Sequence, residues 1–313
     1  MSPGPRVLLT GSGGQLGRAL VAQAPASWEL IATGRADLDL ADPAACRQAV
    51  ERHRPDWVLN AGAYTAVDRA ESEPDLAMAV NAGAPEAFAQ ALAEQGGRLL
   101  QVSTDFVFAG DQGHPYLPEQ SPTPLGVYGA SKAEGERRAR ARLSGERICL
   151  LRTSWVYGPV GHNFCLTMLR LHRLRAGSGE PLAVVSDQVG CPTATHTLAA
   201  ACIAAIKRQV AGVHHWSDAG AASWYDFAVA IGELGVARGL LEHAAAVLPI
   251  GTADYPTPAR RPSYSLLACA ATRAALDLPP VHWRTALARV LEQRARQGDA
   301  GSPSPDAPPS PAP

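Results

Sequence analysis

The sequence predicts an α/β protein built on a doubly wound parallel sheet, joined to a smaller, loop-rich α/β lobe. Short, nearly all-apolar runs alternate with stretches of helical spacing through the first half of the 313 residues, as a parallel sheet covered on both faces requires. A glycine-rich turn separates the first of these runs from the first helical stretch. Together these observations indicate repeated strand, turn and helix units.

Each element of the first half follows from a change in periodicity. Short apolar, β-rich runs predict strands at 6–10, 28–33, 57–60, 99–103 and 147–152. Longer stretches with apolar side chains three or four positions apart predict helices at 15–23, 43–52, 74–94 and 127–143. The alternation predicts a first domain at 1–155.

The second half is less regular. Loops rich in glycine and proline follow residue 155, and helical spacing is clearest at 164–174 and 194–207. We expect a mainly substrate-binding lobe at 156–300, interleaved with a segment near 186–215 that returns to the first domain. Residues 301–313 contain six prolines, and this composition predicts a disordered tail.

Composition excludes several classes of protein. The 28 basic and 29 acidic side chains give a net charge of 28 − 29 = −1, so no basic field predicts a nucleic-acid or anionic-membrane partner. The sequence shows neither a secretory signal nor an apolar run approaching the ~20 residues of a membrane span. The six cysteines lack zinc-site spacing. We therefore expect a cytoplasmic protein with reduced cysteines.

The glycine-rich turn is the first chemical signal. Gly11, Gly14 and Gly17 stand at three-residue intervals between a strand and a helix. They would permit a tight turn, let backbone N–H groups approach a pyrophosphate, and allow the helix to pack closely on the strand. An ordinary flexible turn is the alternative. The predicted cofactor contacts in this turn are Gly11, Ser12, Gly13, Gly14, Gln15, Leu16 and Gly17.

The end of the second strand bears on the choice of dinucleotide. An acidic residue there favours NAD, whereas an arginine can pair with the 2′-phosphate of NADP. The strand runs into Arg35, with no acid before Asp37. This favours NADPH over NADH, although Arg35 could also be a solvated loop residue. Further predicted cofactor contacts follow the second and third strands, namely Asp39, Leu40, Ala61, Ala63, Tyr64 and Thr65.

A tyrosine and a lysine open the helix expected at 127–143. Tyr128 and Lys132 stand at i and i+4, so they share one face of that helix. A nearby ammonium group would lower the pKa of the phenol and make it a usable acid or base. Thr104 and Asp105 follow the fourth strand, at the edge where open α/β sheets bind ligands. An exposed amphipathic helix face is the alternative.

These motifs, in this order and spacing, resemble the extended short-chain dehydrogenase/reductase family, and more narrowly its dTDP-4-dehydrorhamnose reductase subfamily. The narrower resemblance covers about residues 6–295. It rests on strings such as Thr65-Ala66-Val67-Asp68-Arg69-Ala70-Glu71, Ser103-Thr104-Asp105-Phe106-Val107-Phe108, Arg152-Thr153-Ser154-Trp155-Val156-Tyr157 and Tyr255-Pro256-Thr257-Pro258-Ala259 followed by Arg261-Pro262.

The resemblance implies NADPH-dependent reduction of the C4 keto group of a dTDP-4-keto-6-deoxyhexose, a step of dTDP-rhamnose biosynthesis. Tyr128 would protonate the C4 oxygen. Lys132 would hold the nicotinamide ribose and lower the pKa of the tyrosine, and Thr104 would hydrogen-bond the carbonyl oxygen. The implied or predicted substrate contacts are Thr104, Asp105, Tyr128, Trp155, Asn163 and Arg260. Trp155 could instead be a core aromatic residue, and Arg260 a surface arginine.

One departure from the family concerns metal. Some members of the family form dimers around a Mg²⁺ ion that is held by glutamates. By this resemblance, a homodimer is a possible state of this chain. At the aligned positions this sequence has Ala19, His196 and Glu292, and one carboxylate is too few for such a site. We therefore expect no metal. Two alternative functions remain: a nucleotide-sugar epimerase or dehydratase of the same fold, and a non-catalytic NADP-binding regulatory subunit.

Overall fold

A six-stranded parallel sheet forms the centre of the structure, a computed structural model that describes residues 4–298. The strand order is β2–β1–β3–β4–β5–β10. The strands are β1 (Arg6–Thr10), β2 (Glu29–Thr33), β3 (Trp57–Asn60), β4 (Arg98–Thr104), β5 (Ile148–Thr153) and β10 (Gly212–His215). The chain order reverses between β1 and β3, which is where open α/β sheets form their ligand crevice.

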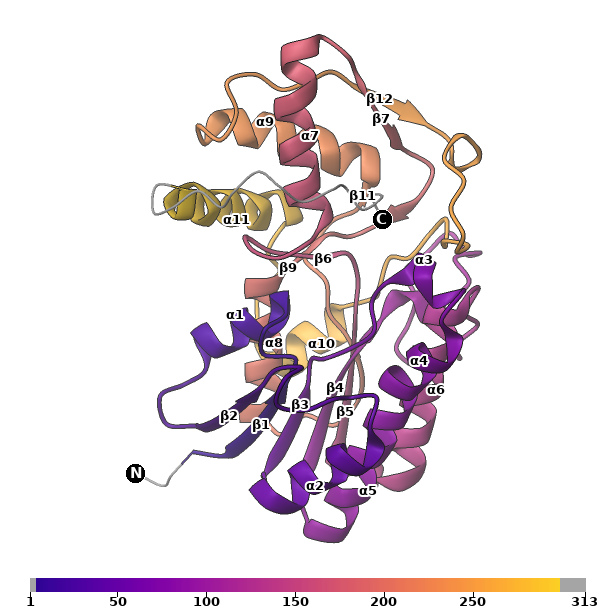
Figure 1. Cartoon of the computed structure of the whole chain (residues 1–313), viewed down its shortest axis with the longest axis vertical. Coiled ribbons are helices and arrows are strands. Elements are labelled where there is room, and N and C mark those ends of the chain that lie inside the picture. Colours follow the sequence, from indigo (N-terminus) through magenta and orange to yellow (C-terminus); the bar gives the residue numbers. More distant parts are fainter. Residues whose placement is uncertain (1–3, 299–313) are drawn as a thin grey trace.

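Helices cover both faces of the sheet, as Figure 1 shows. Helices α1 (Gln15–Gln23) and α8 (Thr195–Lys207) pack together on one face, beside α10 (Ala270–Leu276). Helices α2 (Pro43–His53), α5 (Ala84–Gln95) and α6 (Val127–Arg142) cover the other. Each layer has its own apolar core, which includes Leu198 and Cys202 of α8 on the first face and Phe88 and Leu92 of α5 on the second. The doubly wound fold class is therefore confirmed.

The strands and helices predicted in the first half agree with the structure to within a residue or two, with one exception. The helix expected at 74–94 is present as an unbroken helical run, but it is not α-helical throughout. The structure has α4 (Pro74–Met78), a π-helical turn η1 (Ala79–Gly83) and α5, preceded by the short helix α3 (Val67–Ala70). The apolar periodicity continues through η1, so the sequence pattern does not predict this π-helical turn. Strand β10 was also missed, because its sequence Gly-Val-His-His lacks an apolar run.

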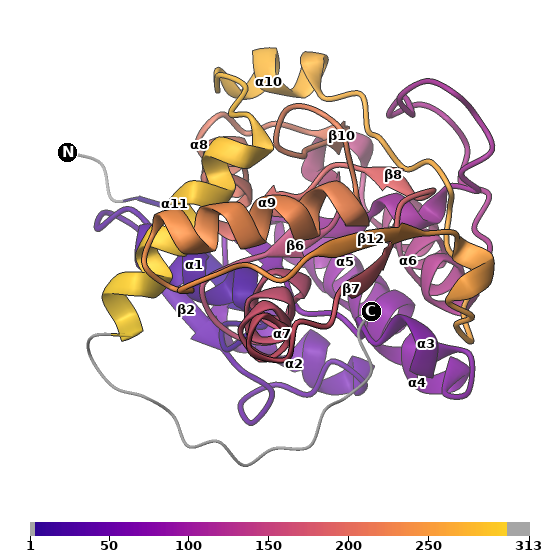
Figure 2. The same cartoon turned by 90° about the horizontal axis from the view of Figure 1, so that it is seen from above.

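A second lobe lies above the carboxyl end of the sheet (Figure 2). Its apolar core joins α7 (Phe164–Ser178), α9 (Trp224–Ala237) and α11 (Trp283–Gly298). Short strand pairs connect these helices: β7 (Leu182–Val185) with β12 (Val247–Ile250), β8 (Val189–Gly190) with β11 (Ala222–Ser223), and β6 (Val156–Tyr157) with β9 (Thr193–Ala194). The tail expected at 301–313 lies outside the described residues.

All six cysteines are buried and free, in agreement with the sequence. Within residues 4–298, no helix has both the length and the apolar character needed to cross a bilayer.

Candidate active site

The loop after β1 is built so that only glycine fits at two of its positions. Gly11 has a φ of +68°, and a Cβ there would lie 2.7 Å from the backbone of Gly62. A Cβ on Gly17 would overlap the Gly11 carbonyl oxygen. Gly13 differs, because no atom lies within 4 Å of the position of its Cβ. The loop thus packs tightly on β3 and α1 while one of its sides stays open.

The turn after β2 lies next to this loop. A Cβ on Gly34 would lie 3.7 Å from Ser12 Oγ, and the Ser12 N–H donates to the Thr33 carbonyl. The carboxylate of Asp37, the first acid after the strand, accepts the Gly34 N–H at 2.8 Å. Arg35 is exposed in the same turn. This geometry leaves the guanidinium accessible to an anionic group beside the glycine loop.

Two of the predicted contacts after β2 have different surroundings. Leu40 packs over the β3 loop, since a Cβ on Gly62 would overlap its side chain. Asp39 is exposed, and its carboxylate accepts the Ala41 N–H at 2.9 Å. Leu40 thus lies beside the loop after β3, and the cofactor contact predicted for Asp39 stays a prediction.

Asn81, which the sequence analysis did not identify, fastens the loop after β3 to helix α6. It belongs to the π-helical turn and is 2% exposed. Its Oδ1 accepts the Tyr64 N–H at 2.9 Å, and its Nδ2 donates to the Tyr64 carbonyl and to Ser131 Oγ, both at 3.0 Å. Ser131 Oγ in turn donates to the Tyr128 carbonyl at 2.8 Å. The loop holding Ala63, Tyr64 and Thr65 is thereby held to the helix that carries Tyr128.

Helix α6 begins with an unusual cap. Its N-cap residue is Gly126, which has no side chain to offer, and the Val127 N–H donates instead to Glu71 Oε1 at 2.8 Å. A Cβ on Gly126 would lie 2.5 Å from that carboxylate oxygen. Tyr128 follows in the first turn, 9% exposed, with its ring edge-on to Phe106 at a centroid distance of 5.5 Å.

The charges of Tyr128 and Lys132 are set mainly by burial. Burial raises the pKa of the Tyr128 phenol to about 12, a rise that the Thr104 hydroxyl opposes and the Asp105 carboxylate reinforces. The expected depression of this pKa by Lys132 is therefore not found, because desolvation disfavours the phenolate more strongly. The Lys132 ammonium donates to the Val102 carbonyl at 2.7 Å, and burial lowers its pKa to about 8.

Thr104 and Asp105 lie at the end of β4, beside Tyr128. Thr104 Oγ1 donates to Asp105 Oδ1 at 3.0 Å and accepts the Phe106 N–H at 3.2 Å, where the chain enters a 3₁₀ turn, η2 (Asp105–Val107). Asp105 is 1% exposed. Burial raises the pKa of its carboxyl to about 6, and the hydroxyls of Ser265 and Thr104 oppose that rise. The structure thus brings together the residues predicted as the proton donor, its neighbours and the lysine.

Trp155 stacks on a second tryptophan that the sequence analysis missed. It follows β5 with a φ of +47°, and its ring lies parallel to that of Trp224 at a centroid distance of 3.6 Å. A Cβ on Gly190 would lie 2.6 Å from the Trp155 ring. Trp224 Nε1 donates to Gln188 Oε1 at 3.1 Å. Trp155 is therefore packed within the protein, and direct contact with substrate stays a prediction.

A cavity of about 170 Å³ opens beside Trp224 in the second lobe. Apolar side chains form most of its wall, and polar ones form the rest. The apolar residues are Phe164, Met168, Leu171, Ala183, Val184, Val185 and Trp224, and the polar ones are Gln188, Tyr255, Thr257 and Arg261. Such a mixture suits a ligand with a flat apolar part and a charged part.

The two arginines of the 255–262 loop have different environments. Arg260, the predicted substrate contact, is exposed. Arg261 lines the cavity, its side chain is 8% exposed, and its Nη2 pairs with Asp68 Oδ2 of α3 at 2.8 Å. Its Nε is buried without a hydrogen-bond partner among residues 4–298. Arg261 is thus the better-placed cation. No local sequence pattern distinguishes it from Arg260, because the difference depends on its contact with Asp68.

Asn163 is occupied by contacts within the protein. As the N-cap of α7 its Oδ1 accepts the Leu166 N–H at 3.0 Å. Its Nδ2 donates to Gln15 Oε1 at 2.8 Å and to the Gly158 carbonyl at 3.0 Å. Asn163 therefore joins the second lobe to the start of α1, and substrate binding by its side chain stays a prediction.

No group of three or more His, Cys, Asp or Glu side chains within residues 4–298 is arranged to hold a metal ion. At the positions aligned with the family's metal ligands, Glu292 pairs with Arg296 at 2.7 Å. Both ring nitrogens of His196 are buried without a hydrogen-bond partner in the described part of the chain.

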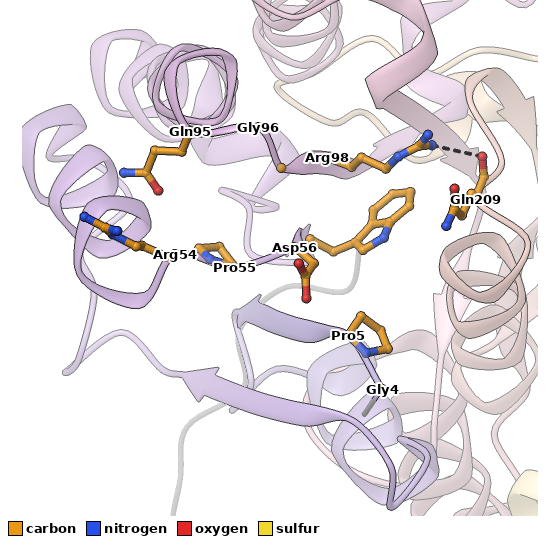
Figure 3. A pocket seen from close by; sticks show the side chains of 11 residues that line it. Gly4, Pro5, Arg54, Pro55, Asp56, Gln95, Gly96, Arg98 and Gln209 are labelled. Atoms are coloured by element: carbon orange, nitrogen blue, oxygen red, sulfur yellow. Dashed lines mark hydrogen bonds between the residues drawn. The ribbon is translucent and has the colours of Figure 1, made fainter. Parts of the chain in front are cut away.

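Another pocket, of about 880 Å³, lies at the amino ends of β1, β3 and β4 (Figure 3). It is lined by residues that precede β1, β3 and β4, such as Pro5, Asp56 and Gly97, together with Arg54, Arg98 and Gln209. Arg98 is tied down by a hydrogen bond to the Gln209 carbonyl at 3.1 Å. Because ligands of open α/β sheets bind at the carboxyl ends of the strands, this pocket is not the candidate site.

Comparison with known proteins agrees with this geometry. Residues 5–296 match the family described as RmlD substrate binding domain. The dTDP-4-dehydrorhamnose reductase of Aggregatibacter actinomycetemcomitans is 38% identical over 293 residues, covering 91% of this chain and 98% of the relative. The enzyme of the same name from Streptomyces griseus is 40% identical over 311 residues, covering 97% and 98%.

A solved structure extends the comparison to three dimensions. The dTDP-4-dehydrorhamnose reductase of Bacillus anthracis in complex with NADP superposes with a TM-score of 0.85 at 33% identity. The match covers 92% of this chain and 99% of that protein, so both lobes are included.

Proposed function

Because the chain belongs to the RmlD substrate-binding-domain family, which includes the dTDP-4-dehydrorhamnose reductases, we propose that it catalyses the NADPH-dependent reduction of dTDP-4-dehydro-β-L-rhamnose to dTDP-L-rhamnose. One observation carries the proposal: Tyr128 lies beside Thr104 at the end of β4, and Lys132 donates to Val102 of the same strand. The neighbouring strand β3 leads into the loop that packs on Gly11. A proton donor, a carbonyl ligand and a cation at that place are the groups a ketone reductase needs.

The chemistry follows from the protonation states. Bound NADPH supplies the hydride that reduces the C4 carbonyl carbon. Tyr128 gives its proton to the C4 oxygen, and the high pKa of the buried phenol keeps that proton available at neutral pH. The Thr104 hydroxyl lies beside the phenol, and it would donate to the same oxygen by turning its one proton away from Asp105 Oδ1. The two free N–H groups of the Lys132 ammonium would hold ribose hydroxyls.

The cofactor residues fit a dinucleotide. The open side of Gly13 and the N-terminus of α1 at Gly14 would receive the pyrophosphate. Arg35 would pair with the 2′-phosphate, which favours NADPH over NADH. Leu40, Ala61 and the loop at 63–65 border the path between these groups and Lys132.

The substrate would span the two lobes. Asp105 would accept a hydroxyl of the sugar. The cavity beside Trp224 would take the base of the nucleotide, with Arg261 at its polar edge. Trp155, Asn163 and Arg260 remain proposed contacts. Any homodimer would form without the magnesium ion that some relatives use, because Ala19 and His196 replace glutamates.

The decisive experiment follows NADPH oxidation with enzymatically prepared dTDP-4-keto-6-deoxyhexose as substrate. Stoichiometric oxidation with formation of a dTDP-6-deoxyhexose is expected. Purified protein that retains bound NAD, with no net oxidation of NADPH, would instead support an epimerase or dehydratase. Cofactor binding without either activity would support a regulatory subunit.

A further inference from the structure

A series of buried polar side chains leads from the candidate active site to the edge of the sheet. Lys132 and Glu136 stand one turn apart on α6, Arg152 lies on β5, and His215 lies on β10. Their exposed fractions are 4%, 4%, 2% and 0%. Glu136, Arg152 and His215 have no part in the chemistry proposed above. Their burial needs an explanation, because burying a charged group is costly unless that group is paired.

Glu136 and Arg152 form a forked ion pair. Arg152 Nη2 lies 2.6 Å from Glu136 Oε2, and Arg152 Nε lies 3.0 Å from Glu136 Oε1. Arg152 Nη1 donates to the Pro118 carbonyl at 3.2 Å. The carboxylate is therefore fixed in position from the neighbouring strand rather than left free on the helix.

His215 adds no charge to this cluster. Its Nδ1 lies 3.0 Å from the Tyr116 carbonyl and so must donate, which leaves Nε2, 3.4 Å from Arg152 Nη1, as the acceptor. Burial lowers the pKa of the imidazole to about 3, so it is neutral at physiological pH. Glu136 is consequently the one carboxylate paired with Arg152.

We propose that Glu136 is a positioning residue that keeps Lys132 in its charged ammonium form, with Arg152 fixing the carboxylate where it can do so. The ammonium needs such support because its hydrogen bond to the Val102 carbonyl offers only a dipole within a buried site. Among the groups that affect the pKa of Lys132, burial lowers it and Glu136 raises it. The titratable groups around the cluster, within residues 4–298, are Tyr128 and Glu136 on α6, Asp105 after β4, Arg152 on β5, His214 and His215 on β10 and Tyr116 in the loop before α6.

The composition of the chain makes this testable on Lys132 itself. The sequence contains only two lysines, Lys132 and Lys207, and Lys207 is exposed. Protein labelled with ¹³C at the lysine ε-carbon therefore gives two signals, which Lys207→Arg assigns. Titration of both with pH reports the protonation of Lys132 in the full chain, with Lys207 as an internal standard.

Three variants define the expected result. Glu136→Gln keeps the size of the side chain but removes its charge, so the Lys132 midpoint should fall by about one pH unit or more. Arg152→Gln removes a nearby cation and should raise the midpoint. Glu134→Gln removes a carboxylate that faces Arg137 and Arg138 on the same helix and should leave the midpoint unchanged.

Two results would overturn the proposal. The first is a Lys132 midpoint that does not shift in Glu136→Gln. The second is a shift in the same direction in Glu136→Gln and Arg152→Gln, which would indicate general loosening of the site. If Glu136→Gln does not fold because Arg152 is left unpaired, Glu136→Gln combined with Arg152→Met removes both charges. That double variant should lower the midpoint by less than Glu136→Gln alone, because Glu136, and not Arg152, is the charge that acts most strongly on Lys132. A wild-type midpoint would again reject the proposal.

The consequence for catalysis rests on the proposed function and has a separate readout. In Glu136→Gln, the dissociation constant of NADPH should begin to rise at lower pH than in the wild type, and Glu136→Asp should restore the wild-type profile. A shifted lysine titration without reductase activity would reject the proposed function alone. Reductase activity with an unshifted titration would reject the role of Glu136 alone.

Discussion

Asp68 and Arg261 form an ion pair between the two lobes, with Oδ2 and Nη2 2.8 Å apart across 193 residues of sequence. The Ala259 N–H also donates to Asp68 Oδ1 at 3.2 Å. Helix α3 therefore fastens the 255–262 loop to the cofactor-binding side of the molecule. Because the pair is partly buried and Arg261 lines the cavity, Asp68 sets the position of the cation at the polar edge of that cavity.

Replacing Arg261 should weaken substrate binding far more than replacing Arg260. Loss of a charged hydrogen-bonding group costs roughly 1.5–3 kcal/mol, so Arg261→Ala should raise the KM for the nucleotide sugar by about tenfold or more. The neighbouring exposed Arg260→Ala is the matched comparison. Steady-state kinetics at saturating NADPH measure both, and a larger effect in Arg260→Ala would return the diphosphate contact to that residue.

Tyr128→Phe should lower kcat by at least ~10²-fold, the usual contribution of a positioned general acid. The ring would keep its contact with Phe106, so the fold and the cofactor site should be preserved. Quenching of NADPH fluorescence on binding gives the dissociation constant, which should match the wild type. Near wild-type turnover in this variant would mean that another group supplies the proton.

Arg35→Ala should reduce the preference for NADPH over NADH by roughly tenfold or more, since a charge-assisted contact to the 2′-phosphate is lost. The KM for NADH should change little. The control is Arg54→Ala, because Arg54 precedes β3 and lies at the amino ends of the strands, away from the cofactor residues. An unchanged cofactor preference in Arg35→Ala would show that the 2′-phosphate is held elsewhere.

Substrate binding should weaken as the pH falls through about 6. Burial raises the pKa of Asp105 to about 6, so the carboxylate that would accept a sugar hydroxyl is present above that pH and is lost below it. The KM for the nucleotide sugar should rise in acid, while Asp105→Asn should show a high KM that is flat over the same range. A wild-type acid limb in Asp105→Asn would assign the titration to another group.

Gly17→Ala and Gly13→Ala should separate packing from cofactor binding. A methyl group at Gly17 overlaps the Gly11 carbonyl oxygen, and overpacking of this kind costs about 1–3 kcal/mol, so Tm should fall by several degrees. Gly13→Ala meets no atom within 4 Å and should keep the wild-type Tm, but it should weaken NADPH binding. Equal Tm values for the two variants would contradict the packing described here.

The regular part of the fold could be predicted because its pattern is local. Apolar runs, glycine spacing and an i, i+4 pair are visible within a few residues, so strands β1 to β5, the glycine loop and the Tyr128 helix were predicted closely. The residues that were missed depend on partners distant in sequence. Asn81 acts on Tyr64 and Ser131, and Arg261 differs from Arg260 only because it meets Asp68.

Three of the predicted roles depended on the folded surroundings rather than on the sequence pattern. The phenol pKa was expected to fall because Lys132 is one turn away, but the desolvation of Tyr128 could not be known from the spacing. Asn163 and Trp155 have residue types suited to sugars, yet their polar atoms or ring faces are taken up by neighbours that only the folded chain supplies.

The cap on α6 also constrains how the protein becomes active. The Val127 N–H depends on Glu71, which lies 56 residues earlier in the chain, so the first turn of the helix that holds Tyr128 cannot be completed by local sequence. The chain must lose the entropy of a loop of that length before the contact can stabilise the helix. Reductase activity should therefore appear late during refolding, after most of the helical signal has returned.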